Sequence, residues 1–174
     1  MDSKHPKIIK AYEFACKAHI AQSYDHFPYS KHLEDVYETV RSFGFSEAIF
    51  EDVDMLCSAL LHDILEDTAT SYSDVKNIFG VTVAETVYCM TDEQGRTRKE
   101  KKEKTLPKIR SNPDSIIIKL CDRISNIRHS IEHNNLDKIS MYKGEHKSFR
   151  WALYVPDHCD AIWRTLNELV EYKS

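Results

Sequence analysis

The stretch Cys57–Asp67 constrains the fold of this chain more than any other, because an apolar run leads directly into a histidine and three carboxylates. In a helix, residues three or four positions apart lie on one face. His62 would then stack with Glu66, and Asp63 with Asp67, along the polar edge of a buried helix. Carboxylates so close together repel one another, and burial increases the repulsion. A bound cation would relieve it; the alternative is an ordinary helix end that becomes solvated.

The rest of the chain favours helices with short joints, since only four of its 174 residues are glycine and five are proline. Apolar residues recur at helical spacing, and only Val81–Met90 fits a strand as well as a helix; its helical neighbours favour helix. We therefore predict an all-α fold, a single compact helical bundle that forms one domain over residues 1–174. The predicted helices are Pro6–Gln22, Ser30–Phe43, Glu51–Leu65, Ser73–Phe79, Val81–Met90, Arg98–Ile109, Ser115–Ile131, Leu136–Tyr154 and Val155–Lys173.

The boundaries of these helices follow from local signals. Ser30 and Ser73 are the expected N-caps of their helices, and Gly44 is expected to stop the second helix. Pro107 is expected to interrupt the basic helix. The segment Ser23–Tyr29 is predicted to be a short loop.

The charges are distributed unevenly along the chain. The net charge is −4, yet residues 51–93 hold ten acidic residues and one basic residue, whereas residues 96–110 hold eight basic and two acidic residues. An acidic metal site beside a basic patch would suit an anionic, phosphate-bearing ligand; the alternative is two solvated helix faces. Arg98, Lys101 and Lys102 share one helix face and are candidates for contact with phosphate. The negative net charge argues against a general nucleic-acid-binding protein.

The sequence carries no signal for secretion or membrane insertion. The polar segment Met1–Lys10 lacks the apolar core of a signal peptide, and no apolar run approaches the ~20 residues of a membrane span. The five cysteines are dispersed, odd in number and flanked by apolar residues. Buried free thiols in a reducing cytoplasm explain them better than disulfides or a zinc site. We therefore expect a cytoplasmic protein with no membrane contact.

Two histidines and two carboxylates are the candidate metal ligands. His32, the pair His62 and Asp63, and Asp122 come from three predicted helices. A carboxylate such as Asp122, inside a strongly apolar helix, needs a partner or a metal. This mixed set of nitrogen and oxygen donors suits manganese, iron or zinc and leaves positions for water and substrate. Water on such a metal has a lowered pKa and becomes a usable nucleophile.

Other polar residues are candidates for proton transfer and substrate binding. Glu66 and Asp67 lie beside the proposed ligands and could handle the proton of an attacking water. Asn126 could hydrogen-bond to a phosphate or to that water. Tyr142 either lines the pocket from a late helix or packs against its neighbours. His129 and His133 read as a polar helix end rather than a second metal site, and both Trp151 and Trp163 are expected to anchor the core.

Three motifs follow one another in the order Pro28-Tyr29-Ser30-Lys31-His32, Leu60–Thr68 and Lys119–Arg128. Together they resemble the HD superfamily of metal-dependent phosphohydrolases. More narrowly, the chain is similar to the hydrolase domain of the RelA/SpoT group and to its small single-domain relatives, the Mesh1-like alarmone hydrolases, from about Ala11 to Trp151. A bare His-Asp pair is weak evidence, whereas three ordered motifs with these flanking residues are specific.

The resemblance implies a role for most of the candidate residues. It implies that Glu66 and Asp67 activate and orient the water and that Asn126 holds the substrate. In the family, the reaction removes pyrophosphate from the 3′ position of guanosine tetra- or pentaphosphate, and some small members remove the 2′ phosphate of NADPH. The residues implied to bind one metal ion, usually Mn²⁺, are His32, His62, Asp63 and Asp122.

The chain departs from the family pattern at two places. His19 and Gln22 match a His-x-x-Gln motif, but Tyr24 stands where the family has an arginine that stacks on the guanine base, and the loop before Pro28 is shortened. Leu33 replaces the usual proline after the motif histidine. Neither change touches the metal ligands, so hydrolysis is expected to survive them, while guanine recognition is affected. Tyr24 is either a substitute stacking residue or a surface loop tyrosine.

The sequence as a whole therefore predicts a manganese-dependent nucleotide phosphohydrolase, with an alarmone 3′-pyrophosphate as the first candidate substrate. The alternatives are a phosphatase of NADPH or of another nucleotide, and a nucleotide sensor that binds without turnover. The expected partner is a small nucleotide rather than a nucleic acid or a membrane, and the chain is expected to be a monomer or a homodimer.

Overall fold

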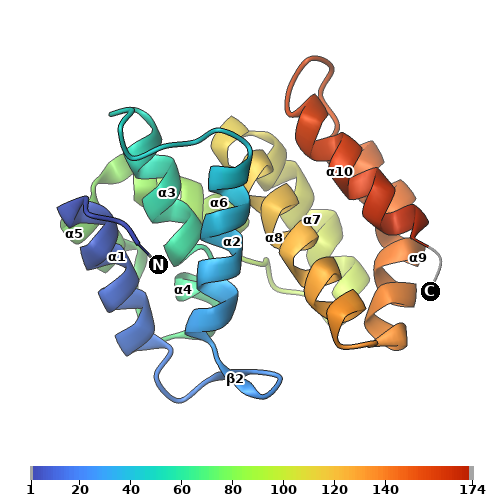
Figure 1. Cartoon of the computed structure of the whole chain (residues 1–174), viewed down its shortest axis with the longest axis horizontal. Helices are drawn as coiled ribbons and strands as arrows, with labels where there is room; N and C mark the ends of the chain where they lie inside the picture. Colours follow the sequence, from blue (N-terminus) through green and yellow to red (C-terminus); the bar gives the residue numbers. More distant parts are fainter. Residues whose placement is uncertain (1, 173–174) are drawn as a thin grey trace.

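The computed structural model describes residues 2–172 and is built almost entirely of helices (Figure 1). The helices are α1 Pro6–Ala18, α2 Ser30–Ser42, α3 Asp52–Leu61, α4 Ile64–Asp67, α5 Tyr72–Phe79, α6 Val81–Met90, α7 Arg98–Arg110, α8 Pro113–Glu132, α9 Leu136–Leu153 and α10 Asp160–Glu171. The predicted all-α fold is confirmed, and Val81–Met90 is a helix as expected. No helix in the described part of the chain is long and apolar enough to cross a membrane.

The helix α8 is the centre of the packing. It contacts α2, α3, α6, α7, α9 and α10, and Figure 1 shows it between α2 on one side and α9 and α10 on the other. Its buried isoleucines and leucine face several neighbouring helices, because consecutive residues of a helix point about 100° apart. These buried residues are Ile116, Ile117, Ile118, Leu120, Ile124 and Ile127. A polar residue on α8 is therefore held rigidly against the other helices.

Several predicted helix ends are shifted. α1 ends at Ala18 rather than Gln22, and Ser30 is the first residue of α2 rather than its N-cap. α5 begins before Ser73, because the Ser71 side chain accepts the Asp74 N–H and the Asp74 carboxylate accepts the Ser71 backbone N–H. Such reciprocal capping satisfies two free N–H groups and defines the helix start.

The prediction for Pro107 was wrong, because α7 runs through it to Arg110. Pro107 is exposed, so the carbonyl that loses its helical partner can bond to water. The last helix begins at Asp160, not at Val155, and its predicted end at Lys173 lies outside the described residues. Gly44 does stop α2, at a φ of 102°, a left-handed conformation that glycine adopts without steric cost.

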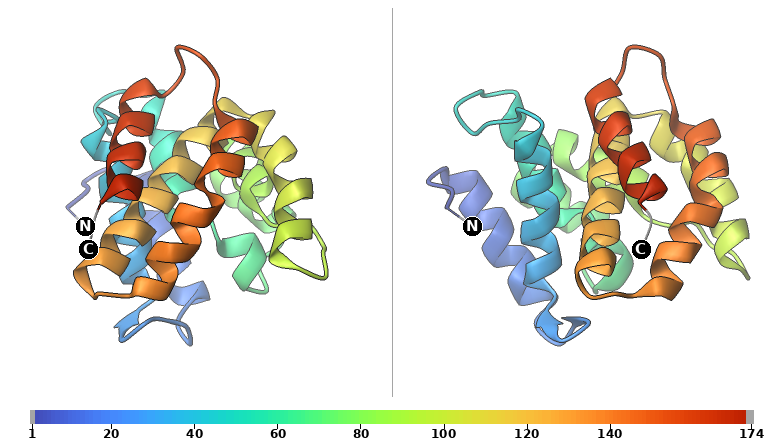
Figure 2. Two further views of the ribbon diagram at one scale, coloured as in Figure 1. Left: turned by 90° about the vertical axis from the view of Figure 1, so that its right-hand side faces the viewer. Right: turned by 45° about the vertical axis from the view of Figure 1, so that its right-hand side comes forward.

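The predicted loop Ser23–Tyr29 contains a two-residue antiparallel ladder, β1 Ser23–Tyr24 paired with β2 Phe27–Pro28. Figures 1 and 2 show this hairpin projecting from one end of the helices. Its turn is tied down by Asp25, whose carboxylate bonds to His129 Nε2 at 2.7 Å and to Lys138 Nζ at 3.2 Å. The hairpin is thus fixed to α8 and α9 although it is far from them in sequence.

The predicted continuous helix Glu51–Leu65 is broken. α3 ends at Leu61 and α4 begins at Ile64, with Asp63 at φ −101° and ψ 0° between them. The sequence analysis had placed His62, Asp63, Glu66 and Asp67 on one continuous helix, and this part of the prediction was wrong. In an unbroken helix, consecutive side chains diverge by about 100°. The break turns His62 and Asp63 toward the same point.

The two tryptophans differ in environment. Trp163 is 2% exposed and packs against Phe149 at a tilt and edge-on to Tyr154, which confirms it as a core anchor. Trp151 is 89% exposed, so the prediction that it anchors the core was wrong. It lies two residues from both Phe149 and Leu153, the buried positions of α9, and therefore on the opposite side of the helix.

Trp163→Ala is expected to lower the free energy of unfolding by about 3–5 kcal/mol, because it removes a large buried side chain and leaves a cavity. Trp151→Ala, the matched control, is expected to stay within about 0.5 kcal/mol of the wild type. Urea unfolding followed by circular dichroism measures both. Equal effects of the two substitutions would contradict the assignment of Trp163 as the anchor.

Candidate active site

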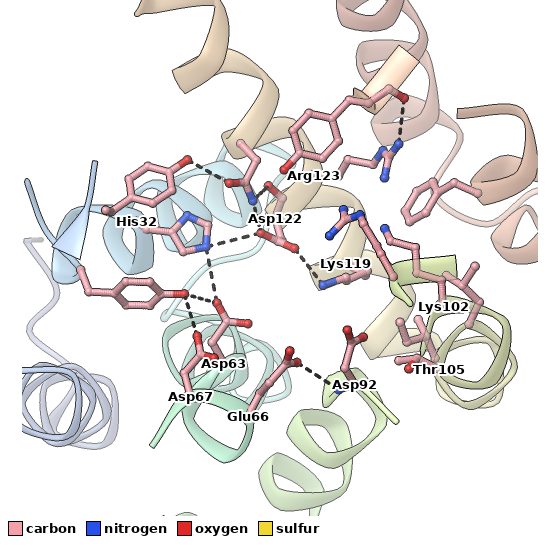
Figure 3. A pocket seen from close by; sticks show the side chains of 18 residues that line it. His32, Asp63, Glu66, Asp67, Asp92, Lys102, Thr105, Lys119, Asp122 and Arg123 are labelled. Carbon is pink, nitrogen blue, oxygen red and sulfur yellow. Dashed lines mark hydrogen bonds and ion pairs between the residues drawn. The ribbon is translucent and has the colours of Figure 1, made fainter. Parts of the chain in front are cut away.

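Four donor atoms from α2, from the α3–α4 break and from α8 converge on one point (Figure 3). His62 Nε2 lies 2.9 Å from Asp63 Oδ2 and 3.2 Å from His32 Nε2. His32 Nε2 lies 3.4 Å from Asp122 Oδ1 and 3.7 Å from Asp63 Oδ2. His62 Nε2 and Asp122 Oδ1 are 3.9 Å apart. All four side chains named from the sequence as ligands are therefore brought together.

The separations among His32 Nε2, His62 Nε2 and Asp63 Oδ2 fit one metal ion, and Asp122 lies beside this group of three. Ligand atoms about 2.0–2.2 Å from a common metal lie roughly 3–3.5 Å from one another at octahedral or tetrahedral angles. The side chains of His32 and His62 are 3% and 2% exposed, so the four atoms meet in a largely dehydrated place.

A backbone carbonyl on the side away from the other donors orients the ring of His62. Its Nδ1 lies 2.9 Å from the carbonyl oxygen of Ala59, which can only accept a hydrogen bond. Nδ1 therefore carries the proton, and Nε2 presents its lone pair toward the other donors. A backbone carbonyl that fixes the tautomer in this way is the usual support for a metal-binding histidine.

The electrostatics of the group favour charged carboxylates. Burial works against the charge of Asp63, but His62 and His32 hold the pKa of Asp63 well below its usual range. Asp122 is held low in the same way, against burial, chiefly by Lys119, whose Nζ lies 3.0 Å from Asp122 Oδ2. Burial lowers the pKa of His32, but its contacts with Asp122 and Asp63 outweigh burial and raise the pKa to about 9. The carboxylates are thus ready to bind a cation at neutral pH.

Glu66 and Asp67 lie on α4, directly beside the converging donors (Figure 3). Glu66 Oε2 accepts the backbone N–H of Asp92 at 3.0 Å, which fixes the direction of its carboxylate. Burial is the largest cause that raises the pKa of Glu66, and it also raises that of Asp67. A carboxylate with a raised pKa accepts a proton more readily than an ordinary one.

Tyr29 supports this side of the site, a role that the sequence did not reveal. Its hydroxyl donates to Asp63 Oδ2 and lies 3.4 Å from Asp67 Oδ2. His19 stacks on the Tyr29 ring with centroids 4.6 Å apart, and Gln22 donates to the backbone carbonyl of Asp67. The His-x-x-Gln motif therefore positions Tyr29 and Asp67 rather than touching the donor atoms. The only sequence signal for Tyr29 was its place beside the motif histidine.

Tyr24 is held inside the site. Its ring stacks on His32 with centroids 4.8 Å apart and contacts His129 at 4.3 Å. Its hydroxyl donates to Asn126 Oδ1 at 2.9 Å, and Asn126 in turn donates to the Asp122 backbone carbonyl at 3.0 Å. Tyr24 is thus neither a free surface residue nor a copy of the guanine-stacking arginine; one of its faces is covered by a candidate metal ligand.

The cavity that contains the donors has a basic opposite side. In Figure 3, His32 and Asp63 lie on one side, Lys102 lies on the other and Lys119 lies between them. Arg98, Lys102 and Tyr142 line the cavity, whereas Lys101 lies outside its described lining. Sequence reasoning missed several lining residues because only packing brings them in: Tyr29, Asp92, Thr105, Lys119 and Arg123.

Comparison with known proteins assigns this architecture. The family model described as HD domain matches residues 11–145. The chain belongs to the HD domain family. The metal-ligand candidates all lie within the matched segment, and the resemblance inferred from the three motifs is confirmed.

Known members of the HD domain family resemble the chain in sequence and in fold. The human guanosine-3′,5′-bis(diphosphate) 3′-pyrophosphohydrolase MESH1 is 27% identical over 99% of this chain and 95% of its own length. The protein of that name from Drosophila melanogaster is 35% identical, over 58% of this chain and 55% of its own length. A solved structure described as "A metazoan ortholog of SpoT hydrolyzes ppGpp and plays a role in starvation responses" superposes with a TM-score of 0.79. It covers 97% of this chain and 96% of its own, at 22% identity, and so supports the fold alone.

Proposed function

We propose that the chain is a metal-dependent nucleotide phosphohydrolase that removes pyrophosphate from the 3′ position of guanosine tetra- or pentaphosphate. One observation carries the proposal: three of the candidate metal ligands, two carboxylates of raised pKa and several basic side chains line one cavity. The activity named for the human relative, which aligns over 99% of this chain, points to the same substrate.

His32, His62, Asp63 and Asp122 would hold the ion, which we propose to be a single Mn²⁺. The ion would supply Lewis acidity and lower the pKa of a water at the site. Lys119 balances the charge of Asp122 and keeps this carboxylate turned toward His32. The carbonyl of Ala59 keeps the lone pair of His62 available.

Glu66 accepts the proton that the attacking water loses, and Asp67 orients that water. The N–H of Asp92 keeps the Glu66 carboxylate in place during the transfer. Asn126 and Tyr24 bound the reacting position from the side of α8 and the hairpin. Arg98, Lys102 and Tyr142 meet the remaining anionic groups of the substrate across the cavity, where fixed positive charge stabilises developing negative charge.

One observation favours a second substrate class. The Tyr24 ring is stacked on His32 and bonded to Asn126, so the guanine-stacking interaction of the family has no direct substitute here. A phosphatase acting on the 2′ phosphate of NADPH or on another nucleotide would use the same metal chemistry with different base contacts. A sensor without turnover is disfavoured, because binding alone has no use for Glu66 and Asp67.

We further propose that residues 1–174 act as one domain, in the cytoplasm, on a small-molecule substrate, as a monomer or homodimer.

A product assay tests the proposed function. The purified protein with Mn²⁺ is offered guanosine tetraphosphate, NADPH and a panel of deoxynucleoside monophosphates, with Asp63→Ala as control. We expect pyrophosphate from guanosine tetraphosphate, absent with the control. Orthophosphate from another nucleotide, and no product from guanosine tetraphosphate, would move the function to the second class. Ligand binding with no product from any compound would sink the enzymatic proposal altogether.

A further inference from the structure

A single carboxylate on α9 binds three cations on the basic side of the cavity. Glu145 Oε1 accepts from Arg98 Nε at 2.7 Å, and Glu145 Oε2 accepts from Lys102 Nζ at 3.1 Å and from Arg123 Nη1 at 3.3 Å. The three cations come from α7 and α8, and all three line the cavity, whereas Glu145 is not among its lining residues. We call Arg98, Lys102, Arg123 and Glu145 the cation cluster.

The cation cluster is short of negative charge. Three cations share one carboxylate, so it carries a net charge of about +2 in a half-buried place. Burial, then the neighbouring Arg98, lowers the pKa of Lys102 to about 8, and Arg98 and Lys102 hold the pKa of Glu145 at about 2 against burial. A half-buried group with surplus positive charge is favourable only if an anion reaches it.

Arg123 is the fixed member of the cluster. It is 3% exposed and lies between the rings of Tyr142 and Phe149, with its guanidinium carbon 4.9 Å and 4.3 Å from their centroids. Its Nη2 donates to the Tyr142 carbonyl at 2.9 Å. Its Nε is buried without a hydrogen-bond partner among the described residues. These contacts hold Arg123 in place independently of Glu145.

We propose that Glu145 is a positioning residue that stands in for a ligand anion: it holds Arg98, Lys102 and Arg123 as an anion subsite across the cavity from the metal-ligand group, and it weakens that subsite's affinity for phosphate. The ligand class is a phosphate group carrying about two negative charges, which would neutralise the cluster. The role in turnover rests on the proposed function, since the subsite would take the phosphate of the substrate that is not cleaved. Because the carboxylate repels that phosphate, it also speeds release of the nucleotide product.

Glu145→Gln separates charge from shape. The amide oxygen can still accept from Arg98, and Arg123 keeps its contacts with Tyr142 and Phe149. Removal of one negative charge beside the bound anion strengthens the attraction. Glu103→Gln is the matched control: it removes the same charge from α7, at an exposed residue whose ion-pair partner is Lys99.

The test is calorimetric titration of the metal-free protein, in chelator, with inorganic phosphate. We expect Glu145→Gln to bind phosphate at least ten-fold more tightly than the wild type, and Glu103→Gln to bind like the wild type. We also expect Lys102→Met, which removes one cation in similar volume, to bind at least ten-fold more weakly. Glu145→Gln affinity equal to or weaker than that of Glu103→Gln would overturn the proposal. So would unchanged binding by Lys102→Met, since phosphate would then lie elsewhere.

Two further measurements, of melting temperature and of KM, also test the proposal. If Glu145→Gln is marginally stable, its melting temperature must rise more steeply with phosphate than that of the wild type; an equal slope overturns the proposal. With active enzyme, KM for guanosine tetraphosphate should fall in Glu145→Gln, while KM for guanosine 3′-diphosphate, which lacks the 5′ group, should not. Because the titration needs neither metal nor turnover, failure of the hydrolase function would leave its result standing.

Discussion

Asp63→Asn is expected to reduce turnover to the background of the assay and to empty the metal site. Asp63 Oδ2 lies 2.9 Å from His62 Nε2 and 3.7 Å from His32 Nε2, so its charge faces both imidazoles at close range. An amide of the same shape can keep its oxygen where it accepts the hydrogen bond from Tyr29, but it presents no charge to a cation. A carboxylate binds a metal ion in its deprotonated, charged form, which an asparagine amide cannot supply.

The measurement pairs turnover with metal content of the purified protein by mass spectrometry. Asp137→Asn, at an exposed position in the first turn of α9, is the matched control and should retain both. Full metal content in Asp63→Asn would remove Asp63 from the ligand set. Full turnover would remove the metal group from the chemistry.

Glu66→Gln is expected to lower kcat by roughly 10²–10⁴-fold, the usual contribution of a positioned general base, with KM and metal content unchanged. The amide oxygen can still accept the N–H of Asp92, so the local structure should persist, but the amide cannot take a proton. Glu85→Gln, on the exposed side of α6, is the control.

The pH dependence of kcat provides a second test of the role of Glu66. Because burial raises the pKa of Glu66, wild-type kcat should fall with acidification at a pH above that of an ordinary glutamate. A base works only when deprotonated, so kcat rises with pH through this pKa and then levels off. In Glu66→Gln this acidic limb should vanish. An unchanged kcat, or an unchanged acidic limb, would assign the proton transfer to another group.

The metal-ligand candidates were accessible from sequence because each is marked by its own neighbours. Asp122 lies inside an apolar helix, and His62 and Asp63 end an apolar run, so each carboxylate or imidazole was out of place unless it met a partner. What the pattern hid was the break between Leu61 and Ile64. Helical periodicity continues across it, so the sequence held no local signal for the break.

The basic side of the cavity was predicted only in part, for the same reason. The helical face shared by Arg98, Lys101 and Lys102 was visible, but which of them enters the cavity depends on how α7 packs on α8 and α9. The local sequence did not reveal the roles of Arg123 and Glu145, because these residues form an ion pair between two different helices, α8 and α9. Trp151 misled for the opposite reason: its type favours burial, while its position on α9 faces outward.

The placement of the metal-ligand candidates on α2, at the α3–α4 break and on α8 also couples ligation to folding. An unfolded chain cannot hold donors from these distant segments near one point, so an ion that binds them binds the native state almost exclusively. Its binding energy then adds to the free energy of unfolding, in proportion to the logarithm of free ion over dissociation constant. An ion bound by residues of α2, the α3–α4 break and α8 would also cross-link the first and second halves of the chain. The concentration of free metal would therefore affect the free energy of unfolding as well as the rate of turnover.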